Sequence, residues 1–111
     1  MKDCIFCKIV RKEIPADVVL EEEDILVFRD IKPKAPVHLL IIPKKHIPSV
    51  NEVSEEDESL LGRMFLTAKK VAKKEGVADS GYKLSVHVGE NAGQEVFHLH
   101  IHLMGWKHVN E

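Results

Sequence analysis

Histidine and large aliphatic residues alternate over seven positions near the end of the chain, from His98 to Met104. This period of two predicts a β-strand with one buried face, because successive side chains of a strand point to opposite sides. Leu99, Ile101 and Leu103 are expected in the core, with three imidazoles in a row on the other face. A chance polar face is the alternative, but a solvated strand would more readily contain Thr, Lys or Glu.

The spacing of the three histidines limits what they can do together. Alternate residues of a strand lie roughly 6.7 Å apart, so His98 and His102 would be separated by roughly 13 Å. One zinc ion, which binds nitrogen at about 2.0–2.1 Å, cannot collect all three from a straight strand. The row therefore favours nucleophilic and acid–base chemistry, to which a neutral imidazole that titrates near physiological pH is suited.

Length and composition are typical of one soluble globular domain, residues 1–111, with 44% hydrophobic and 31% charged residues. The net charge of −2 gives no reason to expect a nucleic-acid or membrane partner. The longest apolar run, residues 39–43, is far too short to span a bilayer, and the first residues do not resemble a signal peptide. We therefore expect a cytoplasmic protein.

The only two cysteines, Cys4 and Cys7, lie in a segment that is expected to form a short helix or turn, residues 4–10. Two cysteines do not make a disulfide framework. A C-x-x-C pair supplies half of a structural zinc site, which imidazoles could complete. A redox pair is the competing interpretation, although no βαβ pattern follows it, and two ordinary buried thiols are the third.

Apolar runs between turn residues predict the strands. Residues 18–20 and 25–28 suggest a hairpin across an acidic turn, and residues 37–42 suggest a central strand that Pro43 stops, with both faces covered. Residues 82–88 resume the alternating pattern. With a short helix first and a long helix between the third and fourth strands, this order predicts an α+β fold with a five-stranded antiparallel sheet.

The long helix is expected between Ser54, a good N-cap, and Gly76, a natural stop. Asp57 stands where its side chain can reach back to Ser54, as in a capping box. Acidic residues in the first turn and lysines in the last favour the helix dipole. One apolar stripe is expected to consist of Leu60, Leu61, Met64, Phe65, Ala68, Val71 and Ala72.

A glycine-containing loop, residues 89–96, comes immediately before the histidine row. Glycine lets backbone N–H groups converge on an anion without obstruction by Cβ. Such a loop alone also fits an ordinary hairpin turn. Because it leads to three histidines, we interpret it as a candidate phosphate cradle.

The pattern of residues 98–104 (HLHIHLM) resembles the signature of the histidine-triad nucleotide-binding proteins, and most of all their nucleoside phosphoramidase branch. The resemblance covers nearly the whole chain and includes residues 4–9 (CIFCKI), 29–31 (RDI), 35–38 (APVH), 42–46 (IPKKH) and 92–96 (AGQEV). It implies the histidine-triad fold. It also implies a two-fold homodimer with a continuous ten-stranded sheet, in contact through the long helix and the strand from Tyr82.

This resemblance implies a hydrolase for purine nucleoside 5′-phosphoramidates or related adenylates. The middle histidine of the family attacks the α-phosphorus, so His100 would form a nucleotidyl-histidine intermediate that water then hydrolyses. A backbone carbonyl is expected to hold the other ring nitrogen of His100, and His102 is expected beside the non-bridging or leaving oxygens. The alternatives are a dinucleoside polyphosphate hydrolase and a zinc-stabilised nucleotide-binding interaction module with little turnover.

The family's binding positions transfer to this sequence residue by residue. Asp30 matches the carboxylate that accepts both ribose hydroxyls, and Gln94 with the neighbouring backbone matches the group that holds phosphoryl oxygens. For Phe6 and Ile9, plain core packing is a compatible alternative. The full set expected to bind an AMP-like purine nucleotide is Phe6, Ile9, Phe28, Arg29, Asp30, Ile31, His87, Gly93, Gln94, Glu95, Val96, His100 and His102.

Zinc-bearing members of the family use two cysteines, a histidine after a Lys-Lys pair and the first histidine of the triad. Cys4, Cys7, His46 and His98 match that set. The resemblance therefore implies a structural Zn²⁺ without an open position for water, and no catalytic metal. It also releases His98 from a catalytic role.

The sequence departs from the family in two places. His87 stands where relatives commonly have Asn, a residue that helps to position the phosphate or ribose. The phosphoramidase branch has a longer tail that reaches the partner's site and helps to set leaving-group specificity, whereas this sequence ends at Glu111, shortly after Trp106. Of the other histidines, His38 is expected to be buried and hydrogen-bonded, and His108 to lie on the surface.

Overall fold

The computed structural model describes residues 4–107, so the expected surface position of His108 lies outside the described residues. Five strands form one antiparallel sheet in the order β1-β2-β3-β5-β4, which confirms the predicted α+β fold. The strands are β1 (Val18–Glu21), β2 (Ile25–Arg29), β3 (Val37–Pro43), β4 (Tyr82–Ser85) and β5 (Ile101–Gly105), and the α-helices are α1 (Ile5–Val10) and α2 (Glu58–Lys74). Short 3₁₀ turns are η1 (Val50–Glu52), η2 (Glu55–Asp57) and η3 (Glu90–Ala92).

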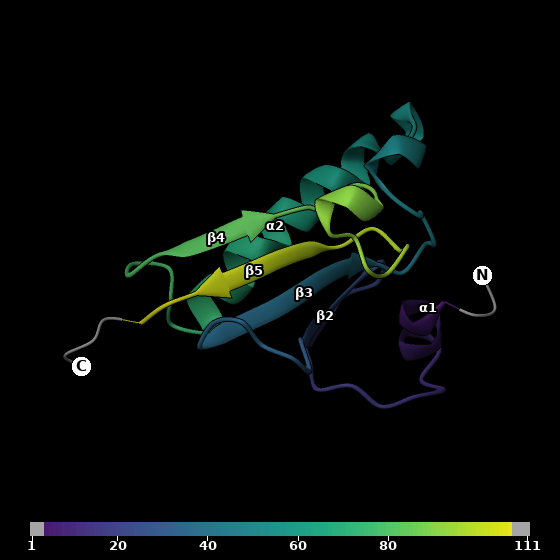
Figure 1. The fold of residues 1–111 in the computed structure, drawn as a ribbon. Coiled ribbons are helices and arrows are strands. Elements are labelled where there is room, and N and C mark those ends of the chain that lie inside the picture. Colours follow the sequence, from purple (N-terminus) through teal and green to yellow (C-terminus); the bar gives the residue numbers. More distant parts are fainter. Residues whose placement is uncertain (1–3, 108–111) are drawn as a thin grey trace.

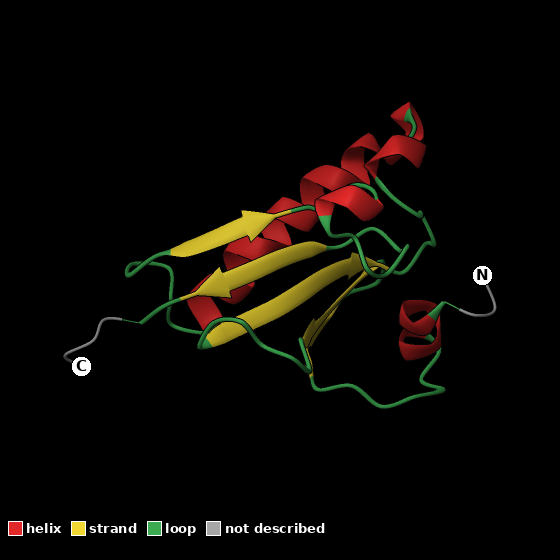
Figure 2. Cartoon of the chain, in the orientation of Figure 1, coloured by secondary structure: helices red, strands yellow, loops and turns green. Residues whose placement is uncertain are grey.

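The two helices lie on opposite faces of the sheet (Figure 1). Helix α2 runs along one face, which we call the helix face, and α1 lies on the other, near the end of β3, as the red helices in Figure 2 show. Side chains alternate between the faces along each strand. The buried strand and α1 side chains are Ile25, Val27, Val37, Leu39, Ile41, Ile101 and Leu103 on the helix face, and Phe6, Leu26, Phe28, Leu40 and Ile42 on the opposite face.

Strand β5 begins later than the histidine pattern predicts, at Ile101 instead of His98. In the register that pairs Ile41 with Ile101, Pro43 would stand opposite Leu99. Proline has no N–H to give to a ladder, so regular pairing stops there. The Leu99 N–H donates instead to the Ile47 carbonyl, at 2.6 Å. Leu99, Ile101 and Leu103 are nevertheless buried in the core, as predicted.

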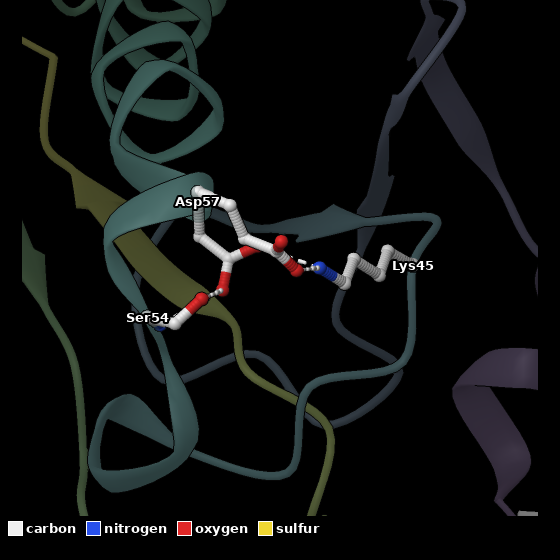
Figure 3. A network of polar contacts seen from close by, with 4 residues as sticks. Lys45, Ser54 and Asp57 are labelled. Carbon is white, nitrogen blue, oxygen red and sulfur yellow. Dashed lines mark hydrogen bonds and ion pairs between the residues drawn. The ribbon is translucent and has the colours of Figure 1, made fainter.

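The expected capping interaction between Ser54 and Asp57 lies at the start of the turn η2, which leads directly into α2 at Glu58. The Asp57 carboxylate accepts the Ser54 N–H at 3.0 Å and an ion pair from Lys45 at 2.7 Å. Figure 3 shows both partners beside Asp57, and the ion pair with Lys45 links this turn to the chain that leaves β3. Lys45 is the main cause that lowers the pKa of the Asp57 carboxyl. At the other end, Gly76 has φ +78, the left-handed conformation expected of a helix stop.

The apolar stripe of α2 differs from the prediction at Phe65. Its side chain is 53% exposed, whereas Thr67 is buried and donates a hydrogen bond to Glu22. Phe65 follows Met64 directly, and a rotation of about 100° per residue moves it to the rim when Met64 points at the sheet. Strand β4 is also shorter than predicted, because it ends at Ser85. No helix within residues 4–107 is long and apolar enough to cross a membrane.

Candidate active site

The ring of His100 is held by the backbone just before it. Its Nδ1 lies 2.6 Å from the His98 carbonyl oxygen. A carbonyl only accepts, so the ring proton lies on Nδ1, and the Nε2 lone pair of the neutral ring is free. Burial lowers the pKa of His100, which keeps the ring neutral. This confirms the expected backbone support and leaves a nucleophilic nitrogen on a ring that is 7% exposed.

His102 joins β5 to the neighbouring strand β3 through His38. Its Nδ1 lies 3.1 Å from Nε2 of His38, and its ring centre lies 4.8 Å from that of His100. His38 Nε2 is also 3.5 Å from the carboxylate of Asp30, just beyond the end of β2. Burial, together with the nearby histidines, lowers the pKa of His102 to about 4. Three elements therefore place a carboxylate and three imidazoles within a few ångströms.

Aromatic side chains cover the other side of His100. Phe6 of α1 makes an edge contact with the His100 ring at 5.1 Å between centres, and another with Phe28 of β2 at 5.4 Å. Ile9 and Val96 pack against the same cluster. These four expected nucleotide-binding residues thus form an apolar surface beside the candidate nucleophile, and their packing role is compatible with contact to a flat base.

The loop before the histidines is braced internally. Gly89 and Gly93 have φ values of +89 and +91, which glycine adopts without strain. The Gln94 side chain is buried, where it accepts the Gly89 N–H at 2.9 Å and donates to the carbonyls of Pro48 and Val96. Gln94 therefore fixes the shape of the loop, and any contact with phosphoryl oxygens depends on the loop backbone.

His87, where the family resemblance leads us to expect Asn, stacks on His102. The ring centres are 4.5 Å apart and the planes differ by 22°. Ser85, which pairs with His102 across β4 and β5, has a buried hydroxyl without a hydrogen-bond partner in residues 4–107. His87 thus lies in the site, against the face of a catalytic candidate.

Two of the expected base-binding side chains lie outside the buried cluster of histidines. The Arg29 guanidinium forms a two-pronged ion pair with Glu75, just past the end of α2, so its side chain is turned toward the helix face. Ile31 is 89% exposed. Asp30, between them, is the member of this segment that contacts the histidines.

The four predicted metal ligands come together at the start of α1. Ligand atoms of Cys4, Cys7, His46 and His98 all lie within 4.8 Å of one another. His98 Nδ1 is 3.4 Å from Cys4 Sγ, and Cys7 Sγ is 3.2 Å from His46 Nδ1. His98 directs its other nitrogen, Nε2, to the Pro43 carbonyl at 2.7 Å, the kind of support that orients a metal-ligating imidazole.

The donor set and its protonation fit a divalent ion. Two sulfurs and two imidazole nitrogens match the tetrahedral preference of zinc. Burial lowers the pKa of His98 to about 4, so its Nδ1 has a free lone pair at neutral pH. Burial and the neighbouring Cys4 raise the pKa of Cys7, so that metal binding would have to displace a proton. Cys4 and His46 also border an open hollow of about 430 Å³ with Pro48, Glu95 and Phe97, which makes the cluster reachable from solvent.

His38 contributes more to the site than the sequence predicts. It was expected to be only a buried, hydrogen-bonded residue, and both properties are confirmed, but its partners are Asp30 and His102. The sequence contains a sign of this. Residues two apart in a strand lie on the same face, so His38 shares the face opposite α2 with Leu40 and Ile42.

Comparison with known proteins agrees with this geometry. A family profile described as "Scavenger mRNA decapping enzyme C-term binding" matches residues 3–111. The purine nucleoside phosphoramidase of Escherichia coli (strain K12) is 50% identical over 104 residues, which is 94% of this chain and 87% of that protein.

Solved structures show the same fold. A HIT family hydrolase from Legionella pneumophila Philadelphia 1 superimposes with a TM-score of 0.92 at 52% identity, over 96% of this chain and 95% of its own. A histidine triad protein from Clostridium difficile gives a TM-score of 0.93 at 36% identity, over 100% and 96% of the two chains.

Proposed function

The chain belongs to the histidine-triad (HIT) family of hydrolases, and we propose that it hydrolyses purine nucleoside 5′-phosphoramidates or related adenylates. The observation that supports this most is the hydrogen bond from His100 Nδ1 to the His98 carbonyl, because it leaves a lone pair on Nε2 of a buried, neutral ring. A relative that is 50% identical has the name purine nucleoside phosphoramidase, which favours this substrate class.

In the proposed reaction, His100 Nε2 forms a bond to the α-phosphorus while the bond from phosphorus to the leaving amine breaks. The Nε2–H of neutral His102 would donate a hydrogen bond to the departing amine, which takes its proton from a water molecule, and the resulting hydroxide then cleaves the nucleotidyl-histidine to release the nucleoside monophosphate. Asp30 would accept the ribose hydroxyls. The loop from Gly93 to Val96 would face the phosphoryl oxygens, and Phe6, Ile9 and Phe28 would contact the base. The backbone of Arg29, the side chain of Ile31 and His87 complete the proposed nucleotide site.

Replacing His100 with Asn tests the catalytic assignment. An amide of similar shape cannot form the covalent intermediate, so hydrolysis of adenosine 5′-phosphoramidate should fall by about a thousandfold or more. Binding of AMP, measured by calorimetry, should persist, because the pocket is otherwise intact. Equal turnover by wild type and His100→Asn would refute the mechanism. Intact binding with negligible wild-type turnover would favour the interaction-module alternative.

A substrate comparison separates the two enzymatic alternatives. The ratio of kcat/KM for adenosine 5′-phosphoramidate to that for a diadenosine polyphosphate should exceed one by a wide margin. The reverse ratio would assign the chain to dinucleoside polyphosphate hydrolysis. Mass spectrometry of acid-quenched, single-turnover samples should also find a nucleotidyl adduct on the peptide that contains His100.

We also propose that Cys4, Cys7, His46 and His98 hold a structural Zn²⁺. The fit of their donor atoms supports it. When bound, the ion would cross-link α1 to the chain after β3 and to the start of the histidine row. Elemental analysis of protein purified without chelators should find about one zinc per chain, and a chelator should lower the melting temperature. Zinc far below one equivalent, or unchanged melting, would contradict the site.

A homodimer is the proposed assembly. Strand β4 lies at the edge of the sheet, and Phe65 and Leu66 of α2 are 53% and 65% exposed, so an unpaired edge and an apolar surface lie on neighbouring elements. Joining two β4 edges would give ten strands. Sedimentation should report twice the chain mass, and Phe65→Lys should shift the equilibrium toward monomer.

We place the protein in the cytoplasm, where cysteine ligands stay reduced. Cell fractionation tests this.

A further inference from the structure

We propose that His38 is a positioning residue that fixes the ring proton of His102 on Nε2, so that His102 presents an N–H donor to the substrate. The assignment of the proton depends only on the hydrogen bonds around His38. The consequence for catalysis rests on the function proposed above.

A backbone amide selects the tautomer of His38. Lys34 N lies 3.0 Å from Nδ1 of His38. An amide N–H can only donate, so Nδ1 of His38 must be the nitrogen without a proton. A neutral imidazole has one ring proton, which therefore lies on Nε2. The loop between β2 and β3 thus selects the tautomer of a histidine that is 4% exposed.

The tautomer of His38 in turn fixes the tautomer of His102. Nε2 of His38 lies 3.1 Å from Nδ1 of His102. Because the proton of His38 is on Nε2, Nδ1 of His102 must accept it, and the ring proton of His102 is left on Nε2. The Asp30 carboxylate, 3.5 Å from the same Nε2 of His38, places a negative charge there that favours the same tautomer.

Both rings are neutral under ordinary conditions, as this chain of donors requires. Burial lowers the pKa of His38 more than Asp30 raises it. Burial and the neighbouring rings of His100, His87 and His38 lower the pKa of His102 to about 4. The tautomers therefore persist throughout the neutral pH range.

A metal site is the competing explanation for the same cluster, since ligand atoms of Asp30, His38 and His102 lie within 4.8 Å of one another. A cation on Nε2 of His38 would force the ring proton onto Nδ1. That proton would then face the Lys34 N–H, donor against donor. His98 shows the opposite arrangement, because a carbonyl accepts from its Nε2 and leaves Nδ1 for a metal. The hydrogen bonds thus separate a metal-binding histidine from a proton-directing one.

The consequence is a pair of adjacent rings with opposite roles. The His98 carbonyl sets His100 with a lone pair on Nε2, and His38 sets His102 with a proton on Nε2. In the proposed reaction these are the nucleophile and the hydrogen-bond donor to the leaving group. Both roles are fixed before substrate binds, so no proton has to move between the rings first.

Nitrogen-15 NMR of the full chain, labelled on histidine, tests the proposal directly. Long-range proton–nitrogen spectra at neutral pH distinguish a protonated ring nitrogen from one with a lone pair. We expect His38 and His102 both to be protonated on Nε2 and His100 to be protonated on Nδ1. A proton on Nδ1 of His102 or of His38 would overturn the proposal, whatever the substrate is.

Variants of His38 test its effect on His102. In His38→Leu, which removes the donor, the His102 nitrogen shifts should move toward a mixture of tautomers, and kcat should fall about tenfold, as for one lost hydrogen bond, with KM nearly unchanged. His38→Gln keeps an N–H donor and should restore most of the kcat. Thr67→Val, buried at the helix face, controls for general destabilisation and should change neither quantity.

The outcomes separate the two proposals. Unchanged His102 shifts and kcat in His38→Leu would overturn the role of His38, even if the wild type is an active phosphoramidase. If the wild type hydrolyses no nucleoside phosphoramidate, the proposed function fails, and the NMR comparison alone decides the tautomer. If His38→Leu does not fold, the wild-type spectrum and the His38→Gln variant decide the role of His38. A loss of kcat in His38→Gln as large as that in His102→Leu would then count against the proposal.

Discussion

The two faces of the sheet use the same strands in opposite ways. The helix face buries aliphatic side chains of β2, β3 and β5 under α2, and its members include Leu39, Ile41 and Met64. The opposite face buries polar rings among its apolar side chains, with His38, His98 and His100 at 4%, 0% and 7% exposure. The first arrangement stabilises the fold through apolar burial. The second keeps the imidazoles neutral, because burial makes their protonated form costly.

This difference indicates a division of labour along each strand. In β5, Ile101 and Leu103 anchor the strand while His102, between them, is directed to the site. Rigid placement of a functional side chain by packed neighbours is what a preformed site requires. Changes on the helix face should therefore alter stability with little effect on turnover, whereas replacing His100 or His102 should lower turnover far more than a change on the helix face does.

Truncation of the helix face should have the largest effect on stability. Met64 is 1% exposed, in the middle of α2. Met64→Ala should lower the free energy of unfolding by about 2–5 kcal/mol, through lost burial and the cavity that remains. Urea unfolding measures it. The kcat of the folded variant should stay within about twofold of wild type, and a large loss of kcat would break the division between the faces.

Acid should destabilise the protein through the opposite face. The pKa of His102 is lowered to about 4 from an ordinary 6.5, so the unfolded chain binds a proton there that the folded chain does not. Stability is therefore complete above 6.5 and is lost as the pH falls toward 4, by at most about 3 kcal/mol for this residue. The slope of unfolding free energy against pH should be smaller in His102→Gln at the same metal content. Equal slopes would contradict the prediction.

Gly105 lies so close to Val77 at the helix face that even an alanine side chain at this position should destabilise the fold. A Cβ at this position would lie 2.7–2.9 Å from three side-chain atoms of Val77. Gly105→Ala should cost about 1–3 kcal/mol, because the chain after α2 or the end of β5 must shift. Thermal unfolding measures the loss, and a second substitution, Val77→Ala, should recover part of it. No recovery would show that the strain arises elsewhere.

The smallest effect is expected at Ser54, the exposed N-cap of the turn η2 that leads into α2. Ser54→Ala should cost only about 0.5 kcal/mol, at the low end for an N-cap, because its backbone N–H still donates to Asp57. Chemical unfolding with closely spaced denaturant concentrations measures it. A loss comparable to that of Met64→Ala would mean that the cap, and not the buried stripe, anchors the helix.

Local pattern predicted most of the secondary structure and the face on which each strand residue lies. The capped helix, the hairpin of β1 and β2 and the central strand follow from spacing of apolar residues, which depends only on near neighbours. The prediction was wrong where a tertiary contact overrode the pattern. The pairing of β3 with β5 stops at Ile101, two residues short of Leu99, because Pro43 would stand opposite Leu99. Helix α2 packs on the sheet with Thr67 buried and Phe65 exposed at the rim.

The sequence by itself determined which chemistry this protein has available: three alternating histidines, a C-x-x-C pair and a glycine-containing loop in a histidine-triad order. Only the tertiary structure decided what each imidazole does. His98 faces the thiols, His100 donates to a carbonyl and His102 accepts from His38, 64 positions away in the chain. The physical reason is that a ring's proton is placed by its hydrogen-bond partners, and for His102 that partner is brought into place only by the pairing of β3 with β5.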